Sequence, residues 1–499
     1  MLNKKKIITT LVCFCNLSLF FAQEDVKQLT QTITLDYVIE KASKNSLDIF
    51  KAKRQYEVNY WEFRSFKASL LPKIDFSANP FTYNRALVER YDSEQNIDVY
   101  RLQQTINSYA NISLSQNIAA TGTRVFLKSS FNRLENFGIS QLETYSTTPV
   151  RIGLNQPIMA FNRFKWQQKT APLEYEIAKK DLIFDLQTIN LKSVQLFFAW
   201  ALASKKYEIA KENKTSAEKL YEIGKKRYKL VAIERDQLLN LELDVYNAQT
   251  RLTKLRQNLV STKAALQLFL REDLQNNAVP ELPALISSLH IDTQKAIDLA
   301  YKNNPDFLNL ELQKIEALRN LDRTIKENRF DLSIDASYGL NQQANAFANA
   351  YNNFLDQQMV AIKLQMPLLD WGERRGNIKT AKLNKEVVDI EIQQNEATKK
   401  QSILETIQDF NAQNQLVTVA LRSSEIAKES YLLTEKRFMA GSVDFLNLTT
   451  SRNAWQNANE NYIQTLQNYW TLYYSVQQST LYNFLQDYDL IQDFKKLIK

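Results

Sequence analysis

Apolar residues recur at intervals of three and four along a segment of about 35 residues between Asp236 and Leu270. This spacing places them on one stripe of a helix and predicts that the helix packs along a neighbour as a coiled coil. The members of the stripe are Leu238, Leu241, Val245, Ala248, Leu252, Leu255, Leu259, Thr262, Leu266 and Phe269. A second stripe with intervals of seven makes the same prediction near the C-terminus: Leu448, Trp455, Tyr462, Tyr469 and Val476. Both stripes indicate helix packing rather than a ligand site.

Long stretches without proline predict very long helices. No proline occurs in the 107 residues between Pro172 and Pro280, or in the 132 residues after Pro367. Two helices of roughly 100 Å and four of about half that length follow from a rise of about 1.5 Å per residue. The expected ranges are Leu35–Ser69, Phe161–Tyr228, Asp236–Leu270, 292–328, 372–438 and 444–484. Two shorter helices placed end to end match one long helix, so the sequence predicts a rod of antiparallel helices.

Much of the chain is repeated. Ile33 to Ala78 matches Ile291 to Ala336 at an offset of 258 positions, and later identities keep an offset of 210. The difference indicates about 48 extra residues in the first copy. The predicted organisation is a signal peptide at 1–22, a first repeat at 23–279 with an extra hairpin at 85–148, a linker at 280–290, a second repeat at 291–485 and a tail at 486–499. Two tandem copies favour a pseudo-symmetric, tube-like protein over a pocketed enzyme.

Short segments between the helices alternate apolar and polar residues, as strands with two different faces do. The alternating positions include Ile74, Phe76, Ala78, Ile112, Leu114, Val125, Leu127, Ile152 and Leu154, then Leu332, Ile334, Ala336, Tyr338, Val360, Ile362, Leu364 and Met366. Thr121-Gly122-Thr123 has the composition of a hairpin turn. Two strands from each copy give four per chain, or six if the extra segment joins the sheet rather than forming a surface loop.

Such strands are the weak signature of an outer-membrane barrel. An open sheet edge cannot face lipid, and the smallest closed barrels have about eight strands. One chain therefore cannot close a barrel by itself, and the strands predict an oligomer.

The first 22 residues have the pattern of a secretory signal, with Lys4, Lys5 and Lys6 before a short apolar core that ends at Phe21. Cys13 and Cys15 are the two cysteines of the chain and lie in this segment, so the mature protein is expected to contain neither disulfides nor reactive thiols. Removing the segment lowers the net charge from +8 to +5, because it holds three lysines and no acid.

The sequence offers little for catalysis. His290 is the single histidine, so motifs that need two histidines cannot form. No Walker loop or GxGxxG motif is present, and we expect no cofactor, no metal and no enzymatic activity. Acidic and basic residues are interspersed along the predicted helices, without the clustered basic stripe that nucleic-acid binding needs.

In order, spacing and duplication, four segments resemble the TolC family of outer-membrane efflux ducts over essentially the whole mature chain. They are Ala68-Ser69-Leu70-Leu71-Pro72-Lys73-Ile74, Leu364-Gln365-Met366-Pro367-Leu368-Leu369-Asp370-Trp371-Gly372, Arg227-Tyr228-Lys229-Leu230-Val231-Ala232-Ile233 and Arg437-Phe438-Met439-Ala440-Gly441-Ser442-Val443-Asp444. The resemblance implies a mainly α fold with some β structure, in which a long antiparallel coiled-coil α-barrel joins an oligomeric transmembrane β-barrel. It further implies a homotrimer with twelve strands in the outer membrane, a periplasmic helical tunnel, a periplasmic adaptor protein and an inner-membrane pump.

The resemblance also implies roles for the turns between the long and the return helices, which form the periplasmic tip in this family. The implied adaptor-docking residues are Arg227, Leu230, Val231, Ala232, Arg437, Ala440, Gly441 and Ser442. The implied gate residues are Asp444, Asn447 and Asp236. Asn447 stands where the best-known member has a second aspartate, which weakens the case for a strongly acidic double ring.

Simpler roles compete with these. A carboxylate at the start of a helix caps free N–H groups, and this applies to Asp236 and Asp444. Arg227 and Arg437 lie in last turns, where cations are favourable, and Gly441 supplies backbone freedom. At the level of the whole protein, the alternatives to a duct are a periplasmic coiled-coil scaffold without a pore and a secreted hydrolase. The scaffold does not explain why strands recur at matched positions, and no acid pair stands in a recognisable catalytic setting.

Overall fold

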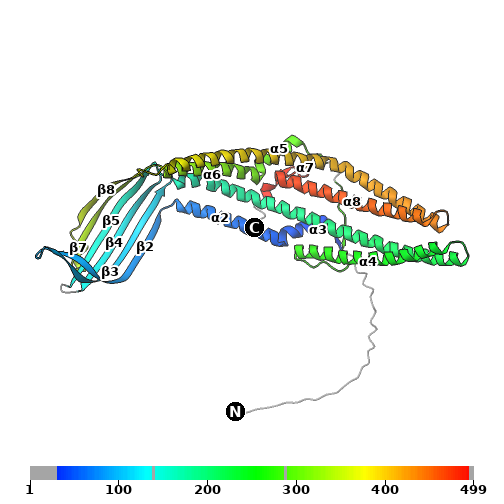
Figure 1. Cartoon of the computed structure of the whole chain (residues 1–499), viewed down its shortest axis with the longest axis horizontal. Helices are drawn as coiled ribbons and strands as arrows, with labels where there is room; N and C mark the ends of the chain where they lie inside the picture. Colours follow the sequence, from blue (N-terminus) through cyan, green and yellow to red (C-terminus); the bar gives the residue numbers. More distant parts are fainter. Residues whose placement is uncertain (1–30, 138–140, 286–288, 494–499) are drawn as a thin grey trace, which may run out of the picture.

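The computed structural model describes residues 31–137, 141–285 and 289–493. The signal peptide expected at 1–22 and the last residues of the expected tail lie outside this part of the chain. The molecule is an elongated rod with a β-sheet at one end and helical hairpins at the other (Figure 1).

The helices follow the repeat closely. In the first copy they are α1 (Leu35–Asn45), α2 (Leu47–Ser69), α3 (Arg163–Lys229) and α4 (Arg235–Leu270), and in the second α5 (Thr293–Asn303), α6 (Pro305–Glu327), α7 (Glu373–Met439) and α8 (Phe445–Thr480). The matched helices have equal lengths of 11, 23, 67 and 36 residues. The expected long helices are confirmed to within two residues at each end, whereas α8 ends four residues earlier than expected, at a left-handed Leu481.

The first helix of each copy is broken, which corrects the expectation of single helices over Leu35–Ser69 and 292–328. Ser46 has extended backbone angles and its hydroxyl accepts a hydrogen bond from the Ile49 N–H, so α2 starts anew. In the second copy, Asn304 caps α6 in the same way before Pro305. Proline lacks an N–H and disfavours helical geometry in the residue before it, so the break follows from the local sequence.

The main sheet has six strands, in the order β2-β3-β4-β5-β7-β8, with every neighbouring pair antiparallel. The bounds are β2 (Lys73–Asp92), β3 (Ile97–Ile118), β4 (Thr123–Phe137), β5 (Leu142–Ile158), β7 (Asp331–Ala344) and β8 (Leu355–Gln365). The extra segment at 85–148 therefore forms strands rather than a surface loop. The sheet therefore has six strands per chain, the second of the two counts that the sequence allowed.

The helices lie four abreast along the rod. Near the sheet the order is α2-α3-α6-α7, and toward the other end it is α4-α3-α8-α7. All ten members of the stripe on α4 are buried or half-buried, and α4 packs along α3. The main core is built from residues of several of these helices, and its buried aromatic side chains include Phe197, Phe198, Trp200, Phe410, Tyr469 and Tyr473.

Small elements join this core. Strand β1 (Thr32–Ile33) pairs in parallel with β6 (Val279–Pro280). Strand β9 (Tyr482–Asn483) pairs with β10 (Tyr488–Asp489), and two 3-10 helices, η1 (Phe347–Asn349) and η2 (Leu490–Asp493), complete the described chain. Among the helices of the described residues, none is both long enough and apolar enough to cross a membrane.

Candidate functional site

The sheet has one apolar and one polar face over the half nearer the helices. The register aligns Ile74, Leu114, Leu127, Ile152 and Tyr338 in one row across five strands. The next row, on the other face, holds Asp75, Ser113, Lys128, Arg151 and Gly339. On β7 the apolar positions run from Leu332 to Leu340, about 27 Å at roughly 3.4 Å per residue. A band about 25 Å tall is the height that a membrane barrel exposes to lipid.

Polar groups end the apolar band at its outer limit. Arg133 on β4 donates to Glu135 at 2.8 Å and also bonds Glu143 on β5. Tyr145 donates to the same Glu143 at 2.6 Å, and its ring lies edge-on to Phe347. Charges and aromatic rings at the limit of an apolar band are typical of the membrane–water interface.

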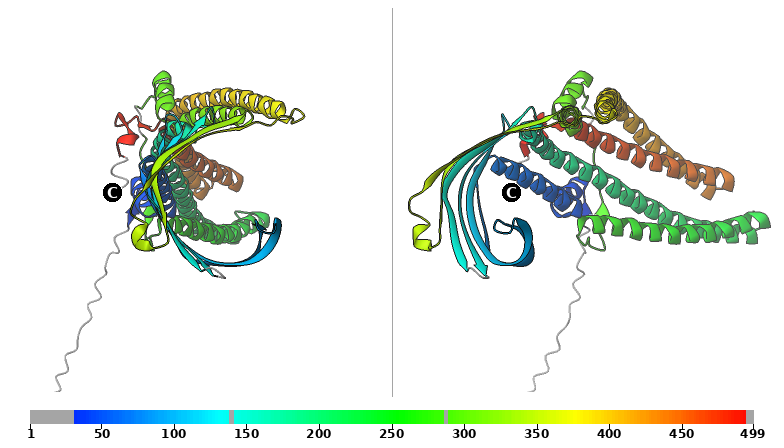
Figure 2. Two further views of the ribbon diagram at one scale, coloured as in Figure 1. Left: turned by 90° about the vertical axis from the view of Figure 1, so that its left-hand side faces the viewer. Right: turned by 60° about the vertical axis from the view of Figure 1, so that its left-hand side comes forward.

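At the opposite end of the rod, two turns join the long helices to the return helices (Figures 1 and 2). In the first, Val231 N–H donates to Tyr228 O and Ala232 N–H to Arg227 O, both at 2.9 Å. The second turn repeats both bonds from Gly441 and Ser442, also at 2.9 Å. These paired bonds satisfy the last carbonyls of each long helix and require a left-handed residue.

The two turns place different residues in the left-handed position. Gly441 has φ +82°, which costs a glycine little. The equivalent Val231 has φ 57° and is 91% exposed. A β-branched residue in this region is strained by roughly 1–2 kcal/mol, and such strain concentrates at functional sites. Leu230 beside it is 78% exposed, so the first turn presents a strained apolar tip to solvent.

Arg227 connects the two turns. Its Nη2 donates to the backbone carbonyl of Met439, the last residue of α7, at 2.7 Å. A Cβ on Gly441 would lie 3.5 Å from the same nitrogen, so the guanidinium passes close to the second turn. Arg437, the repeat mate of Arg227, is exposed. The structure thus brings only one of the two predicted arginines between the turns.

A cleft of about 570 Å³ lies between the two turns. Five of the predicted site residues line it, namely Arg227, Ala232, Gly441, Ser442 and Asp444. The other six predicted residues, Leu230, Val231, Arg437, Ala440, Asp236 and Asn447, are exposed.

The capping role holds for one predicted gate residue and not for the other. Asp444 is the N-cap of α8, and its Oδ1 accepts from the Asn447 N–H at 2.8 Å. The N-cap of α4 is Glu234, the repeat mate of Asp444, and its N–H donates to Gln237. The expectation that Asp236 caps α4 is wrong, because α4 starts one residue before it. Asp236 still lies in the first turn, where a negative charge suits the helix dipole.

Sequence reasoning missed a buried ion pair between the two return helices. Arg452 on α8 donates through both terminal nitrogens to the carboxylate of Asp244 on α4, at 3.0 and 3.1 Å. The side chains are 10% and 15% exposed. No local pattern signals this pair, because the pairing depends on how α4 and α8 lie about α3.

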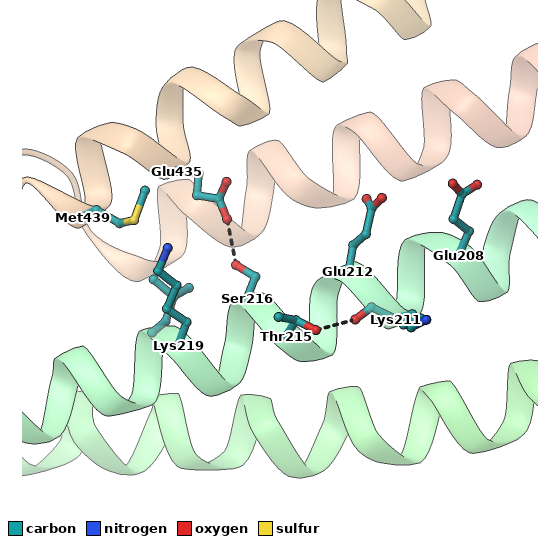
Figure 3. A pocket seen from close by; sticks show the side chains of 9 residues that line it. Glu208, Lys211, Glu212, Thr215, Ser216, Lys219, Glu435 and Met439 are labelled. Carbon is teal, nitrogen blue, oxygen red and sulfur yellow. Dashed lines mark hydrogen bonds between the residues drawn. The ribbon is translucent and has the colours of Figure 1, made fainter. Parts of the chain in front are cut away.

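A polar cleft of about 540 Å³ lies between α3 and α7 above the tip (Figure 3). Ser216 Oγ donates to Glu435 Oε1 at 2.7 Å across it, as the dashed line in Figure 3 shows. Tyr431 donates to the same carboxylate oxygen at 3.3 Å. Burial raises the pKa of the Tyr431 hydroxyl to about 12, so this donor stays protonated at neutral pH. These hydrogen bonds indicate that the residues join the two hairpins rather than bind a ligand.

Three solved structures show the fold in other organisms. The Campylobacter jejuni CmeC outer membrane channel has a TM-score of 0.65 and 16% identity, covering 93% of this chain and 90% of that chain. The Vibrio cholerae outer membrane protein VceC has a TM-score of 0.61 and 12% identity, covering 89% and 95%. The open state of the Neisseria gonorrhoeae MtrE outer membrane channel has a TM-score of 0.57 and 13% identity, covering 89% and 88%.

Comparison with curated protein sequences gives no significant match. A sequence model of the outer membrane efflux protein family, however, matches residues 38–270 and 296–479, which is most of the chain. Together with the two-faced sheet and the rod of long helices, this match confirms the resemblance drawn from the sequence. The chain belongs to the outer membrane efflux protein family, and it is a channel protein of an efflux system rather than an enzyme.

Proposed function

We propose that three copies of this chain assemble into one continuous duct, with a closed β-barrel in the outer membrane and a helical tunnel in the periplasm. Strands β2 and β8 are the two end strands of the sheet, and closing the barrel between copies would pair them. An unpaired edge is costly in lipid, where water cannot satisfy the backbone groups. The apolar face together with these two edges is the observation that carries the proposal.

The edges of the helical layer support the same assembly. Helix α7 lies at one edge and exposes Leu383, Val387 and Ile390 by 44%, 51% and 64%. At the same height along the rod, helix α2 lies at the opposite edge and exposes Val58 and Trp61 by 49% and 63%. Apolar stripes on both edges suit contacts between neighbouring copies in a closed ring.

The tip turns are the proposed contact with a periplasmic adaptor, which connects the duct to an inner-membrane pump. Leu230 and Val231 offer exposed apolar surface in the first turn, and Ala440, Gly441 and Ser442 offer the backbone of the second. Work comes from the pump, and the duct conducts passively. The six strands and the apolar face argue against the periplasmic scaffold, which would leave a lipid-sized apolar band in water.

Conductance in planar bilayers, with the mass of the detergent-purified protein measured by light scattering, tests the duct. We expect discrete channels from a species of three chains. A tip closed without its adaptor would suppress current, so a variant expected to loosen the tip helices, Arg452→Met, is measured in parallel. A detergent-independent species that conducts in neither form contradicts the proposal.

The gate role of Asp444 requires a test that separates charge from capping. The substitution Asp444→Asn keeps an N-cap side chain while removing the charge, because asparagine caps as well as aspartate. We therefore expect Asp444→Asn to lower cation selectivity with no loss of stability, and Asp444→Ala to lower both. Unchanged ion selectivity in the Asp444→Asn variant would leave capping as the only role of this residue.

A further inference from the structure

The extra hairpin of this chain, β3 with β4, lies in the middle of the sheet, between β2 and β5. We propose that each copy contributes all six strands to the membrane barrel, so that the trimer has eighteen strands with β2 of one copy paired to β8 of the next. This inference rests on the proposed duct and specifies its membrane section. An eighteen-stranded barrel is wider than the twelve-stranded barrel that four strands per chain would form.

The register leaves no place for β3 and β4 outside the barrel. Strand β4 pairs with β3 without interruption from Gln104↔Phe137 to Ile118↔Thr123, and on its other side with β5 from Arg124↔Asn155 to Asn136↔Leu142. Strand β2 has β3 as its partner within the described chain. A four-stranded contribution would require breaking both ladders and pairing β2 directly with β5.

The inserted strands also carry the chemistry of a membrane wall. Every even position of β3 from Ile112 to Ile118 is exposed, and three of these four are apolar. The odd positions between them are the polar residues Ser113, Ser115 and Asn117. Surface hairpins in water have no need for this alternation, whereas strands between lipid and an aqueous lumen do.

The strand number is even, which allows closure between identical copies. Strand β2 leaves the helical end of the rod and β8 returns to it, so the two end strands run in opposite directions. A β8–β2 junction between neighbouring copies is therefore antiparallel, like every other pairing in the sheet. Antiparallel pairing can therefore continue around the whole ring.

Six strands also match the width of the helical layer. Strands about 4.8 Å apart and tilted by about 40° cover about 37 Å of circumference when there are six, and about 25 Å when there are four. Four helices about 9 Å apart cover about 36 Å. Since the helices lie four abreast, six strands continue the wall of the tunnel without a change of circumference.

The consequence for transport is a wide outer section. Barrel diameter grows roughly linearly with strand number, so eighteen strands give a barrel about 1.5-fold wider than twelve, and barrels of this size enclose an aqueous channel. The membrane barrel is then no narrower than the helical tunnel that it continues.

Electron microscopy of the detergent-purified protein, viewed along the rod, together with its mass, tests the inference. We expect three chains and eighteen strands. Three chains around a twelve-stranded barrel, with β3 and β4 outside it, would overturn the six-strand contribution while leaving the duct. Two chains with twelve strands would keep six per chain but refute the trimer, and a single chain would refute the proposed duct itself.

A matched pair of substitutions tests the environment of the inserted hairpin in the membrane. Leu114→Arg places a charge on the apolar face of β3, and Ser113→Arg places the same charge on its polar face. We expect at least about a tenfold loss of assembled protein in the outer membrane for Leu114→Arg, and close to normal assembly for Ser113→Arg. Equal assembly of the two variants would show that β3 does not face lipid and would overturn the inference.

Discussion

The two tip turns have the same backbone and different chemistry. Both close with the same pair of hydrogen bonds, yet the first has a strained, exposed Val231 and the second a relaxed Gly441. The first supplies Arg227, which reaches across, and the second supplies the carbonyl of Met439, which receives it. Duplication therefore preserved the geometry of the hairpins while their side chains specialised, and each hairpin now depends on the other.

The largest loss of stability is expected from breaking the buried ion pair that joins the two hairpins. Arg452→Met leaves the Asp244 carboxylate without its bidentate partner, and we expect a loss of about 3 kcal/mol in stability because breaking a buried pair strands a charge. Hydrogen exchange of amides in α4 and α8 measures it. The double variant Arg452→Met with Asp244→Leu removes both charges and is expected to recover most of the loss.

Lys206 and Glu460 provide the control for this prediction. They form a 2.9 Å pair between α3 and α8, but the side chains are 28% and 27% exposed. Lys206→Met is expected to cost less than about 1 kcal/mol, as more solvated pairs do. Equal losses for Lys206→Met and Arg452→Met would show that burial does not decide the strength of these contacts.

The next largest effect is a difference in stability between substitutions of the two repeat-related arginines. Arg227→Met removes the bond to Met439 and leaves that carbonyl without this partner, so we expect a loss of about 1.5–2 kcal/mol. Arg437→Met, the same change at the equivalent exposed position, is expected to stay within about 0.5 kcal/mol. Denaturant unfolding of the purified protein compares them, and similar losses would refute the asymmetry of the tip.

Exchanging the left-handed residues is expected to shift stability in opposite directions. Gly441→Val introduces a β-branched residue at φ +82° and should cost about 1–2 kcal/mol. Val231→Gly relieves the same strain and should gain up to about 1 kcal/mol, less the entropy that glycine loses. If Val231→Gly also destabilised the protein, packing rather than backbone strain would dominate the first turn.

The smallest expected effect is a pH dependence of stability that comes from Asp181. Burial, then the nearby carboxylates of Asp185 and Asp306, raises the pKa of Asp181 from 3.8 to about 6. The folded state then binds a proton more readily than the unfolded state between these values, so stability falls as pH rises from about 4 to 6. After allowance for solvent screening, we expect Asp181→Asn to gain about 1 kcal/mol at pH 7.5 and to flatten this dependence.

The repeat mate of Asp181 is the exposed Glu391, which offers a matched comparison. Glu391→Gln is expected to leave the melting temperature and its pH profile nearly unchanged, because an exposed carboxylate is well solvated in both states. A pH profile of the Asp181→Asn variant that is identical to that of the native protein would exclude Asp181 as its source.

Much of the fold follows from local sequence patterns. Proline-free stretches and apolar periodicity locate α3, α4 and α7 to within two residues, since long periodic segments override weak local signals. The breaks at Ser46 and Asn304 were missed because a helix interrupted for a single residue keeps its apolar periodicity. Alternation found the strands but could not decide whether the inserted hairpin joins the sheet, since pairing partners are set by tertiary contacts.

The site divides in the same way. Gly441 and the capping role of Asp444 could be predicted, because turn and cap chemistry is local. The pairing of Arg452 with Asp244 and the reach of Arg227 to Met439 could not, because both depend on how the two hairpins lie against each other. Repeat symmetry even misleads here, since it predicts equal roles for Arg227 and Arg437.

The equal lengths of the paired helices restrict how this protein can evolve. Helices α3 and α7 each have 67 residues, and α4 and α8 each have 36. One inserted residue turns the rest of a helix by about 100° and moves its apolar stripe off its neighbour. A longer or shorter rod therefore requires whole-heptad changes made together in four helices. The length of the rod can therefore change only in steps of about 10 Å, one heptad at a time.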